Sequence, residues 1–318
     1  MALQAIPILT IYILAYTKVS IVLNKPENAR VSHIKGEWIM TKSGSAAKLI
    51  ALLAGGMLAA SAPASRAADA KFQTATPGVL VIATEVGNPG WMNGTDPGNV
   101  KGGVEWAMAE QLAKDWGIPK VVFRNISFTP LISGTATGYD IGLMTIFKTP
   151  AREKVNTYSD CYYVEDSGAL VKKGTKLATE ADAKKLQWGH VTGGYAGLIL
   201  QKLSPDKQPK AFQDGPTEYN ALLSGTVDAI LDDFSSVAGR TRAAGFENTE
   251  VAGILALKGV PAPCAAAQLP KSAPGGNVSA LNAELAKFKS EGLMKSWMEQ
   301  YLAPNGVDPS KYKRIEIQ

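Results

Sequence analysis

The stretch MTIFKTPAREKVNTYSDCYY, at residues 144–163, carries the most specific information in the chain. Thr149 before Pro150 predicts a helix start, because threonine caps helix N-termini and proline loses no hydrogen bond at the first helical position. Arg152 then falls in the first turn, where the helix dipole disfavours a cation. An arginine there usually holds an anion, and its planar guanidinium suits a carboxylate. The pattern indicates a carboxylate-binding arginine, with a surface ion pair as the alternative.

A second segment, DAILDD at residues 228–233, ends an apolar strand on two carboxylates. Adjacent strand residues face opposite sides, so we expect only one of Asp232 and Asp233 to point into a given cleft. That carboxylate either pairs with an ammonium group or caps the following helix at Ser235. VTGGYAG, at residues 191–197, predicts a strand, a glycine turn and a helix start with free N–H groups for an anion. It lacks both phosphate-loop motifs, so nucleotide binding is weakly supported.

Strand-like and helix-like patterns alternate through the rest of the chain. Such alternation with short connections predicts βαβ units, largely parallel sheets and an α/β fold. The count fits two α/β lobes of roughly 100 residues each. In open α/β sheets the ligand binds beyond the carboxyl ends of the strands, so functional side chains are expected there. The predicted strands cover residues 78–84, 121–125, 139–145, 168–173, 187–191, 228–232, 250–257 and 264–270, and the predicted helices cover residues 104–117, 129–138, 180–185, 195–203, 217–224, 279–290 and 293–302.

Composition excludes some classes of protein. Of the 318 residues, 46% are apolar, which excludes a disordered chain. Lysine and arginine number 33 against 28 aspartates and glutamates, a net charge of +5. Residues 1–67 contain seven of the basic and two of the acidic side chains, so the whole excess lies there. The rest is charge-balanced, and the net charge therefore indicates neither a nucleic acid nor a membrane lipid as partner.

The N-terminal segment predicts export. After Met40, two lysines precede an apolar stretch at residues 49–60, and small residues follow. These are the three parts of a secretory signal peptide, here at residues 40–67, and about 12 apolar residues are too few to span a bilayer as a helix. We expect cleavage near Ala67 and a periplasmic protein. Residues 1–39 are interpreted as a gene-start artefact or a disordered extension, with a membrane anchor as the alternative.

Two cysteines, Cys161 and Cys264, follow the predicted signal peptide. An even pair in an oxidising compartment permits one disulfide without requiring it. His190 is the only histidine after the predicted cleavage site, and the sequence contains no CxxC and no HExxH motif. Metal binding through histidine or cysteine, and nucleophile–histidine catalysis, are therefore poorly supported. We expect no metal and no cofactor.

The span of residues 78–302 resembles the periplasmic solute-binding proteins of polar amino-acid ABC importers, extracellular family 3. The most specific match is TPAREKVNTYSDCYY at residues 149–163, which is similar to the signature TPERxxxVDFSDPYY. GVLVIATEVGNPGW at residues 78–91 resembles the opening strand and ligand loop, and GGVEWAMAEQLAKDWG at residues 102–117 resembles the helix that reads GFDVDLAKAIAKRLG. ALLSGTVDAILDD is similar to the segment that ends in the ammonium-binding aspartate, and ELAKFKSEGLMKSWMEQYL resembles the closing helix pair.

This resemblance implies a two-lobed periplasmic binding fold of type II, in which each lobe is a mostly parallel sheet flanked by helices and two hinge strands join the lobes. Residues 68–161 and 265–318 would form the first lobe, and residues 162–264 the second. Cys161 replaces the proline of the family's DPYY, and Cys264 begins the returning strand. The resemblance therefore implies a Cys161–Cys264 disulfide across the hinge.

Ligand-binding roles also follow from the resemblance. Arg152 matches the arginine that binds the substrate α-carboxylate, with Thr149 and Thr145 on the same loop. Asp233 matches the aspartate that binds the α-ammonium group. Asp232 matches the neighbour of that aspartate. Thr192 and Gly193 match the anion loop of the second lobe, and Glu85 and Asn88 lie in the first ligand loop.

Three positions depart from the family pattern. Asn88 stands where the family usually has a stacking tyrosine or phenylalanine, and we expect Trp91 to supply a ring instead. Phe147 occupies a position usually held by a small polar residue beside the carboxylate, and Glu85 replaces an aspartate. These departures leave the identity of the substrate open.

The resemblance implies a carrier without catalytic activity, a monomer that captures an amino acid or similar small carboxylate between its lobes and docks on an inner-membrane ABC permease. Paired charges and no nucleophile suit this role. One alternative is an accessory or sensor protein on the same fold with a ligand that is not an amino acid, which the missing aromatic at Asn88 favours. Another is an enzyme like the periplasmic cyclohexadienyl dehydratases, in which Glu85 or Asp232 would be the general acid or base. Fold resemblance alone does not choose among these three.

Overall fold

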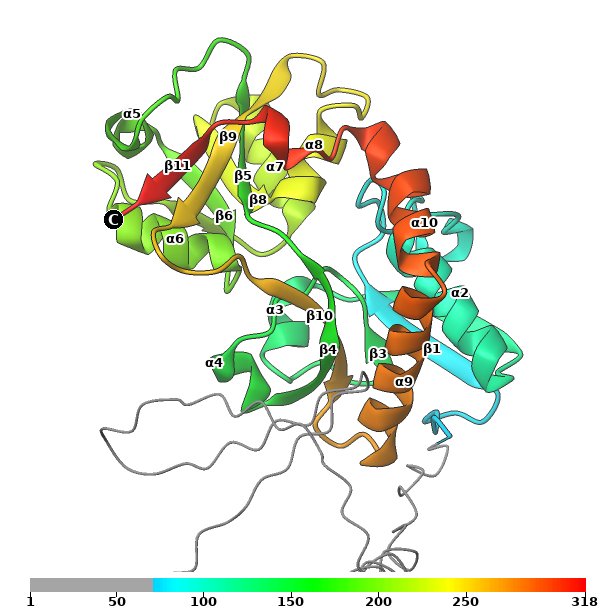
Figure 1. Cartoon of the computed structure of the whole chain (residues 1–318). Helices are drawn as coiled ribbons and strands as arrows, with labels where there is room; N and C mark the ends of the chain where they lie inside the picture. Colours follow the sequence, from blue (N-terminus) through cyan, green and yellow to red (C-terminus); the bar gives the residue numbers. More distant parts are fainter. Residues whose placement is uncertain (1–70) are drawn as a thin grey trace, which may run out of the picture. The chain divides into compact units, whose positions relative to one another are not determined.

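The structure is a computed structural model that describes residues 71–318. The predicted signal peptide at residues 40–67 and the extension at residues 1–39 lie outside the described residues. Between residues 71 and 318, no helix is both long enough and apolar enough to cross a membrane. Figure 1 shows the described chain as two sheets with helices against them.

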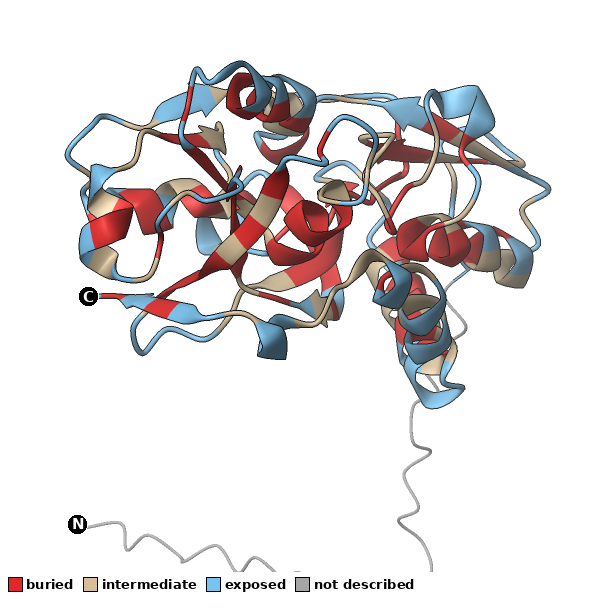
Figure 2. Cartoon of the chain, turned by 90° about the horizontal axis from the view of Figure 1, so that it is seen from above, coloured by how far each residue is buried: buried red, intermediate tan, exposed pale blue. Residues whose placement is uncertain are grey.

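The first lobe is built on a five-stranded sheet in the order β2-β1-β3-β10-β4. Its core lies between the sheet and three helices, α2, α9 and α10, whose apolar residues include the fully buried Met108, Leu112 and Phe288. Buried residues concentrate on the strands and on the inward helix faces (Figure 2). The elements are β1 (Val79–Thr84), α2 (Val104–Trp116), β2 (Lys120–Asn125), α3 (Phe128–Ile132), β3 (Ile141–Gly142), α4 (Pro150–Glu153), β4 (Asn156–Val164), β10 (Cys264–Pro270), α9 (Gly276–Ser290) and α10 (Leu293–Tyr301).

The second lobe is built on a six-stranded sheet in the order β11-β9-β5-β8-β6-β7. Two apolar cores lie on its two faces, one containing Trp188 and Leu200 and the other containing Phe234 and Val237. The elements are β5 (Ser167–Lys172), α5 (Glu180–Lys185), β6 (Trp188–Val191), α6 (Tyr195–Leu203), β7 (Lys210–Phe212), α7 (Gly215–Ser224), β8 (Ala229–Asp233), α8 (Phe234–Arg240), β9 (Thr249–Leu257) and β11 (Arg314–Ile317).

Both sheets are mixed. Their parallel pairs are β1 with β2 and β3, β6 with β7 and β8, and β9 with β11. Every antiparallel pair of strands within residues 71–318 involves β5 or β10. β5 is the first strand after the chain crosses to the second lobe, and β10 is the first strand after it returns. The predicted two-lobed architecture is confirmed, and the parallel parts are those built from βα units.

Two sequence-based expectations differ from the structure. The predicted strand over residues 139–145 is reduced to β3, because the chain leaves the sheet after Gly142 and Thr145 adopts a left-handed backbone with a φ of 45°. The expected lobe boundary placed residues 265–318 in the first lobe, whereas β11 pairs in parallel with β9 in the second sheet. The apolar side chains of Ile315 and Ile317 are buried there, which explains the third crossing.

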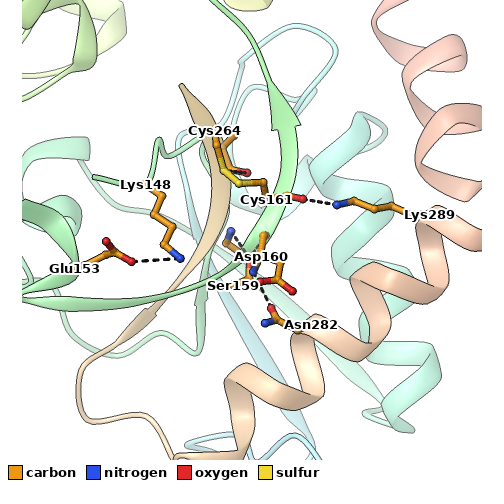
Figure 3. Close-up of a disulfide and its surroundings, with 10 residues drawn as sticks. Lys148, Glu153, Ser159, Asp160, Cys161, Cys264, Asn282 and Lys289 are labelled. Atoms are coloured by element: carbon orange, nitrogen blue, oxygen red, sulfur yellow. Dashed lines mark hydrogen bonds and ion pairs between the residues drawn. A yellow bond between two sulfur atoms is a disulfide. The ribbon is translucent and has the colours of Figure 1, made fainter. Parts of the chain in front are cut away.

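The hinge strands β4 and β10 are antiparallel neighbours. Cys161 and Cys264 form a disulfide between them, with their Cα atoms 5.6 Å apart (Figure 3). The carbonyl oxygen of Cys161 also accepts a hydrogen bond of 2.5 Å from Lys289 Nζ on α9. The predicted disulfide is confirmed, and it lies at the edge of the first lobe where the chain passes to the second.

Removing this disulfide is expected to destabilise the protein by about 2–4 kcal/mol, because the bond closes a long loop in the unfolded chain. The two cysteines are 103 positions apart. The measurement is urea unfolding of a Cys161→Ala/Cys264→Ala double variant against the oxidised wild type. Wild type treated with reductant is the matched control and should lose a similar amount, and equal stability of all three samples would contradict the prediction.

Candidate functional site

A cleft lies between the two lobes, beyond the carboxyl ends of strands from both sheets. It encloses a cavity of about 70 Å³. Glu85 follows β1, Phe128 follows β2, Thr145 follows β3 and Asp233 ends β8. This is where ligands bind in open α/β sheets. The residues that line the cleft are Glu85, Asn88, Phe128, Met144, Thr145, Phe147, Arg152, Val191, Gly194, Tyr195, Ala196, Gly215, Leu231, Asp232, Asp233 and Ser236.

Arg152 lies where the sequence predicts it, in the first turn of a short helix. Thr149 is the N-cap of α4, and its hydroxyl accepts a hydrogen bond of 3.3 Å from the backbone N–H of Arg152. The arginine is only 7% exposed and lies over the ring of Phe128, 5.2 Å from its centroid. Its guanidinium donates to the carbonyl oxygens of Phe147, at 2.5 Å, and Gly193, at 2.8 Å. The alternative of a surface ion pair is therefore wrong.

These two carbonyl partners come from different lobes, so Arg152 bridges the cleft. Burial lowers the pKa of the guanidinium, and the nearby Asp233 opposes that shift. Carbonyl oxygens are neutral acceptors, and a carboxylate would form stronger, charge-assisted bonds with the same N–H groups. The buried guanidinium of Arg152 can therefore bind a small anion.

Asp233 lies on the opposite wall of the cleft, at the end of β8. It is the N-cap residue of α8, but its side chain makes no capping hydrogen bond. Instead, Asp233 Oδ2 accepts a hydrogen bond of 3.0 Å from Thr145 Oγ1 in the first lobe. The capping alternative is therefore wrong, and the carboxylate is directed at the other lobe.

Asp232 and Asp233 both line the cleft, although strand alternation predicted only one of them. The alternation ends at Asp233, because this residue is both the last residue of β8 and the N-cap of α8. Asp232 accepts hydrogen bonds from the hydroxyl of Tyr219, at 2.7 Å, and from the backbone N–H of Asp233, at 2.9 Å. Burial raises the pKa of each aspartate, and that of Asp233 is raised further by Asp232 and Glu165.

Glu85 reaches across the cleft from the first lobe. One of its carboxylate oxygens lies 2.8 Å from the point that a Cβ atom on Gly215 would occupy, so the glycine makes room for it. Burial raises the pKa of Glu85 to about 7, and the negative charges of Asp232 and Asp214 add to this shift. The side chain is thus an acid that titrates near neutral pH at the wall of the second lobe.

Asn88 and Trp91 both contact the second lobe, but in different ways. Asn88 lines the cleft, and its Nδ2 donates a hydrogen bond of 3.1 Å to Ser236 Oγ. Trp91 is fully buried outside the cleft lining, against Tyr162 and Tyr163. Its indole N–H donates to Ser235 Oγ at 2.8 Å. The expectation that Trp91 supplies a ring to the ligand is therefore wrong.

The remaining predicted site residues lie behind the lining. Thr149 caps α4, and Gly193 contributes only its carbonyl oxygen to Arg152. Thr192 accepts a hydrogen bond of 3.4 Å from the hydroxyl of Thr129 through its own carbonyl. These residues shape the cleft without facing its cavity.

Sequence reasoning missed several lining residues, notably the aromatic rings of Phe128 and Tyr195. Tyr195 meets the predicted Phe147 edge to face, with ring centroids 5.8 Å apart. Phe128 follows the carboxyl end of β2, and Tyr195 begins α6 after β6. The strand-end rule that located the aspartates applies equally to these rings, so the signal was present.

Glu105 supports the site from inside the first lobe. It lies on α2 with 1% exposure, and its Oε1 accepts hydrogen bonds from the backbone N–H of Thr145, at 2.7 Å, and from the hydroxyl of Tyr162. Thr145 is one of only two residues other than glycine with positive φ in the described chain. Glu105 therefore holds the strained loop that directs the Thr145 hydroxyl toward Asp233.

Replacing Glu105 by alanine is expected to cost about 1–3 kcal/mol of stability, because two buried donors lose their acceptor. The measurement is the free energy of unfolding in urea at pH 7. Glu110 is an exposed glutamate on the same helix. The Glu110→Ala variant is therefore the matched control, with an expected change within about 0.5 kcal/mol. Equal losses in the two variants would contradict the role of Glu105.

Comparison with known proteins places this two-lobed fold among the extracellular solute receptors. Residues 80–304 match the model of the bacterial extracellular solute-binding proteins, family 3. The match covers well over half of the chain, so the protein belongs to this family. The resemblance on which the predicted architecture rests is thereby confirmed.

Individual relatives bind different amino acids, according to their names. The chain is 27% identical over 278 residues to a probable histidine-binding protein of Neisseria gonorrhoeae, covering 83% of this chain and 98% of that protein. It is 29% identical over 160 residues to the L-cystine-binding protein TcyJ of Escherichia coli, covering 49% of this chain and 59% of that protein. These names differ in ligand but agree on amino-acid binding.

Solved structures share the fold. The solute receptor for L-cysteine of Neisseria gonorrhoeae superposes with a TM-score of 0.62 at 25% identity, covering 73% of this chain and 94% of that one. An amino acid ABC transporter substrate-binding protein of Streptococcus pneumoniae, bound to L-arginine, superposes with a TM-score of 0.60 at 20% identity, covering 72% and 96%. The second likeness concerns the fold alone.

Proposed function

We propose that this protein is the periplasmic substrate-binding component of an amino-acid ABC importer and that its ligand is held by Arg152 and Asp233. The single observation that carries the proposal is the placement of these two opposite charges in one interlobe cleft, where Arg152 is buried and Asp233 is half-buried. Arg152 would bind the α-carboxylate and Asp233 the α-ammonium group. The relatives named for histidine and cystine support an α-amino acid as the ligand.

The ligand would replace hydrogen bonds that Arg152 and Asp233 now make within the protein, two of which join the lobes. The guanidinium of Arg152 would exchange the carbonyl oxygens of Phe147 and Gly193 for the ligand carboxylate, and Asp233 would exchange the hydroxyl of Thr145 for an ammonium group. Each exchange turns a neutral partner into a charged one in a site shielded from water, where such bonds are stronger. Glu85, Asn88 and Asp232 would contact the side chain of the ligand.

The test is a thermal-shift screen of the purified protein against the twenty amino acids and small carboxylates, followed by calorimetry. We expect at least one α-amino acid to raise the melting temperature by several degrees, because a ligand at 100 times its Kd stabilises the native state by about 2.7 kcal/mol. A carboxylate or an amine that lacks the other α-group should bind far more weakly. Stabilisation by carboxylates alone would contradict the paired-charge site.

The cellular role extends this proposal. A protein that captures a solute between two lobes would deliver it, in the closed form and as a monomer, to an inner-membrane ABC permease. Uptake of the ligand by cells that lack this protein is the discriminating assay, since an accessory or sensor protein would bind the same ligand without affecting transport. Loss of uptake is the result expected here.

One observation favours a second function. Glu85 has a pKa of about 7 and lines the cleft, properties that suit a general acid. The dehydratase alternative therefore predicts turnover of cyclohexadienyl acids that resemble prephenate. A carrier would not turn over these acids. If the protein is a dehydratase, Glu85→Gln should abolish its activity.

A further inference from the structure

The cleft contains more acidic groups than an α-ammonium group requires. Glu85, Asp232 and Asp233 all line the cavity, and Glu218 lies behind them, close enough for mutual repulsion. If Asp233 binds the α-ammonium group and Arg152 the α-carboxylate, Glu85 and Asp232 remain without a partner charge. An additional positive charge on the ligand would compensate them.

Arg240 is the cation of the protein whose charge acts on both of these carboxylates, but its guanidinium contacts other groups. Arg240 Nη2 donates to the carbonyl oxygen of Gly87 at 3.2 Å, and its guanidinium lies 4.4 Å from the ring centroid of Tyr219. Arg240 forms no ion pair with any carboxylate of residues 71–318, and it is not part of the cleft lining. It moderates the negative potential at Glu85 and Asp232 without neutralising either group.

Glu218 provides a second, independent observation. It is fully buried on α7, and neither of its carboxyl oxygens has a hydrogen-bond partner within residues 71–318. A buried carboxyl without a partner is costly unless it is protonated or compensated by a positive charge nearby. The charges that face it are the negative ones of Asp232, Glu85 and Asp233. The acidic region of the cleft thus extends below its surface.

The charges follow an order along the cleft. The guanidinium of Arg152 contacts the carbonyl oxygens of Phe147 and Gly193. Glu85 and Asp232 instead lie beside α7, where Glu85 approaches Gly215 and Asp232 accepts a hydrogen bond from the hydroxyl of Tyr219. A complementary ligand therefore carries a carboxylate at one end, an ammonium group next to it and a second cation at the far end. The carboxylate of Glu85 reaches that far end because Gly215, which has no side chain, leaves room for it.

We infer that the ligand is an α-amino acid with a cationic side chain, guanidinium or ammonium, and that Glu85 and Asp232 bind that side chain. The inference rests on the proposed function and specifies the class of substrate. The relatives named above for histidine and cystine do not select this class, so the charge distribution of this chain carries it.

The test uses pairs of ligands that match in shape and differ in charge. Calorimetry of the purified protein at pH 8 compares L-arginine with L-citrulline, and L-lysine with L-norleucine. We expect the cationic member of at least one pair to bind at least about tenfold more tightly than its neutral partner, a difference of about 1.4 kcal/mol. Citrulline and norleucine binding as tightly as arginine and lysine would overturn the inference and leave the proposed function standing. Absence of binding by every α-amino acid would overturn the proposed function itself.

Variants test whether Glu85 and Asp232 cause the preference for a cationic ligand. Glu85→Gln and Asp232→Asn should each reduce the arginine-to-citrulline affinity ratio, and the double variant should bring it close to one. Gly215→Ala, which displaces the Glu85 carboxylate without changing any charge, should also reduce the ratio. Glu316→Gln removes an equal charge from an exposed position on β11 and should leave the ratio unchanged. An unchanged ratio in the folded Glu85 and Gly215 variants would overturn the assignment.

Discussion

Replacement of Arg152 by alanine is expected to weaken ligand binding severely while the protein stays folded. In the wild type the guanidinium covers the carbonyl oxygens of Phe147 and Gly193. Without it, a bound carboxylate would face two acceptors and no donor. Truncating one partner of a buried, hydrogen-bonded charge pair costs about 2–5 kcal/mol, which weakens binding roughly 30-fold to several thousand-fold.

The measurement is calorimetry with whichever amino acid the wild type binds, together with a melting curve of the protein alone. Arg152→Lys keeps the charge but loses the planar fork, so we expect it to bind more weakly than wild type and more tightly than the alanine variant. The control is Arg124→Ala, which removes an exposed arginine that donates to the carbonyl oxygen of Gly138. Wild-type affinity in the Arg152→Ala variant would refute its role in binding.

Raising the pH from about 5 to about 8 is expected to destabilise the protein in the absence of ligand. Burial raises the pKa of Glu85 and of Glu105 from 4.5 to about 7, and that of Glu165 to about 8. The pKa of Glu218 and those of Asp232 and Asp233 are raised as well. These groups therefore keep protons in the folded protein at pH values where the unfolded chain has lost them.

The sign follows from proton linkage. Above about pH 5 the unfolded state binds fewer protons than the folded state, so the free energy of unfolding falls as the pH rises and levels off above the raised pKa values. A single carboxyl raised from 4.5 to about 7 contributes on the order of 3 kcal/mol. We expect a loss of at least that size. The carboxyls with lowered pKa values, such as Asp182 at about 2, titrate below this range.

Urea unfolding at a series of pH values tests this prediction. Glu105→Gln removes one buried acid, which accepts hydrogen bonds from Tyr162 and the backbone of Thr145 and whose charge also raises the pKa of Glu165, and it should flatten the pH dependence. Asp182→Asn is the matched control, since its carboxyl is already ionised throughout the range. Stability that rises between pH 5 and pH 8, or an equal slope in the wild type and in Glu105→Gln, would contradict the assignment of these buried acids.

Local sequence patterns were sufficient to predict α4, the short helix that contains Arg152, and the strand that ends at Asp232 and Asp233. The order threonine, proline and arginine specifies a cap, a helix start and a cation in the first turn through interactions within a few residues, and α4 has this arrangement. The sequence DAILDD places Asp232 and Asp233 at the end of a strand, and this too depends on residues that are neighbours in the sequence. The family signature around Cys161 then implied the neighbouring hinge strands and their disulfide.

Interactions between distant segments required the folded structure. Both Asp232 and Asp233 line the cleft because the strand ends there, and Trp91 is buried because Ser235 and Tyr163 from other parts of the chain surround it. The contact of Glu85 with Gly215 joins residues 130 positions apart. Short-range patterns determine which residues end a strand or begin a helix. The packing of the two lobes decides which of those ends face one another, because packing depends on all the apolar surface that folding buries.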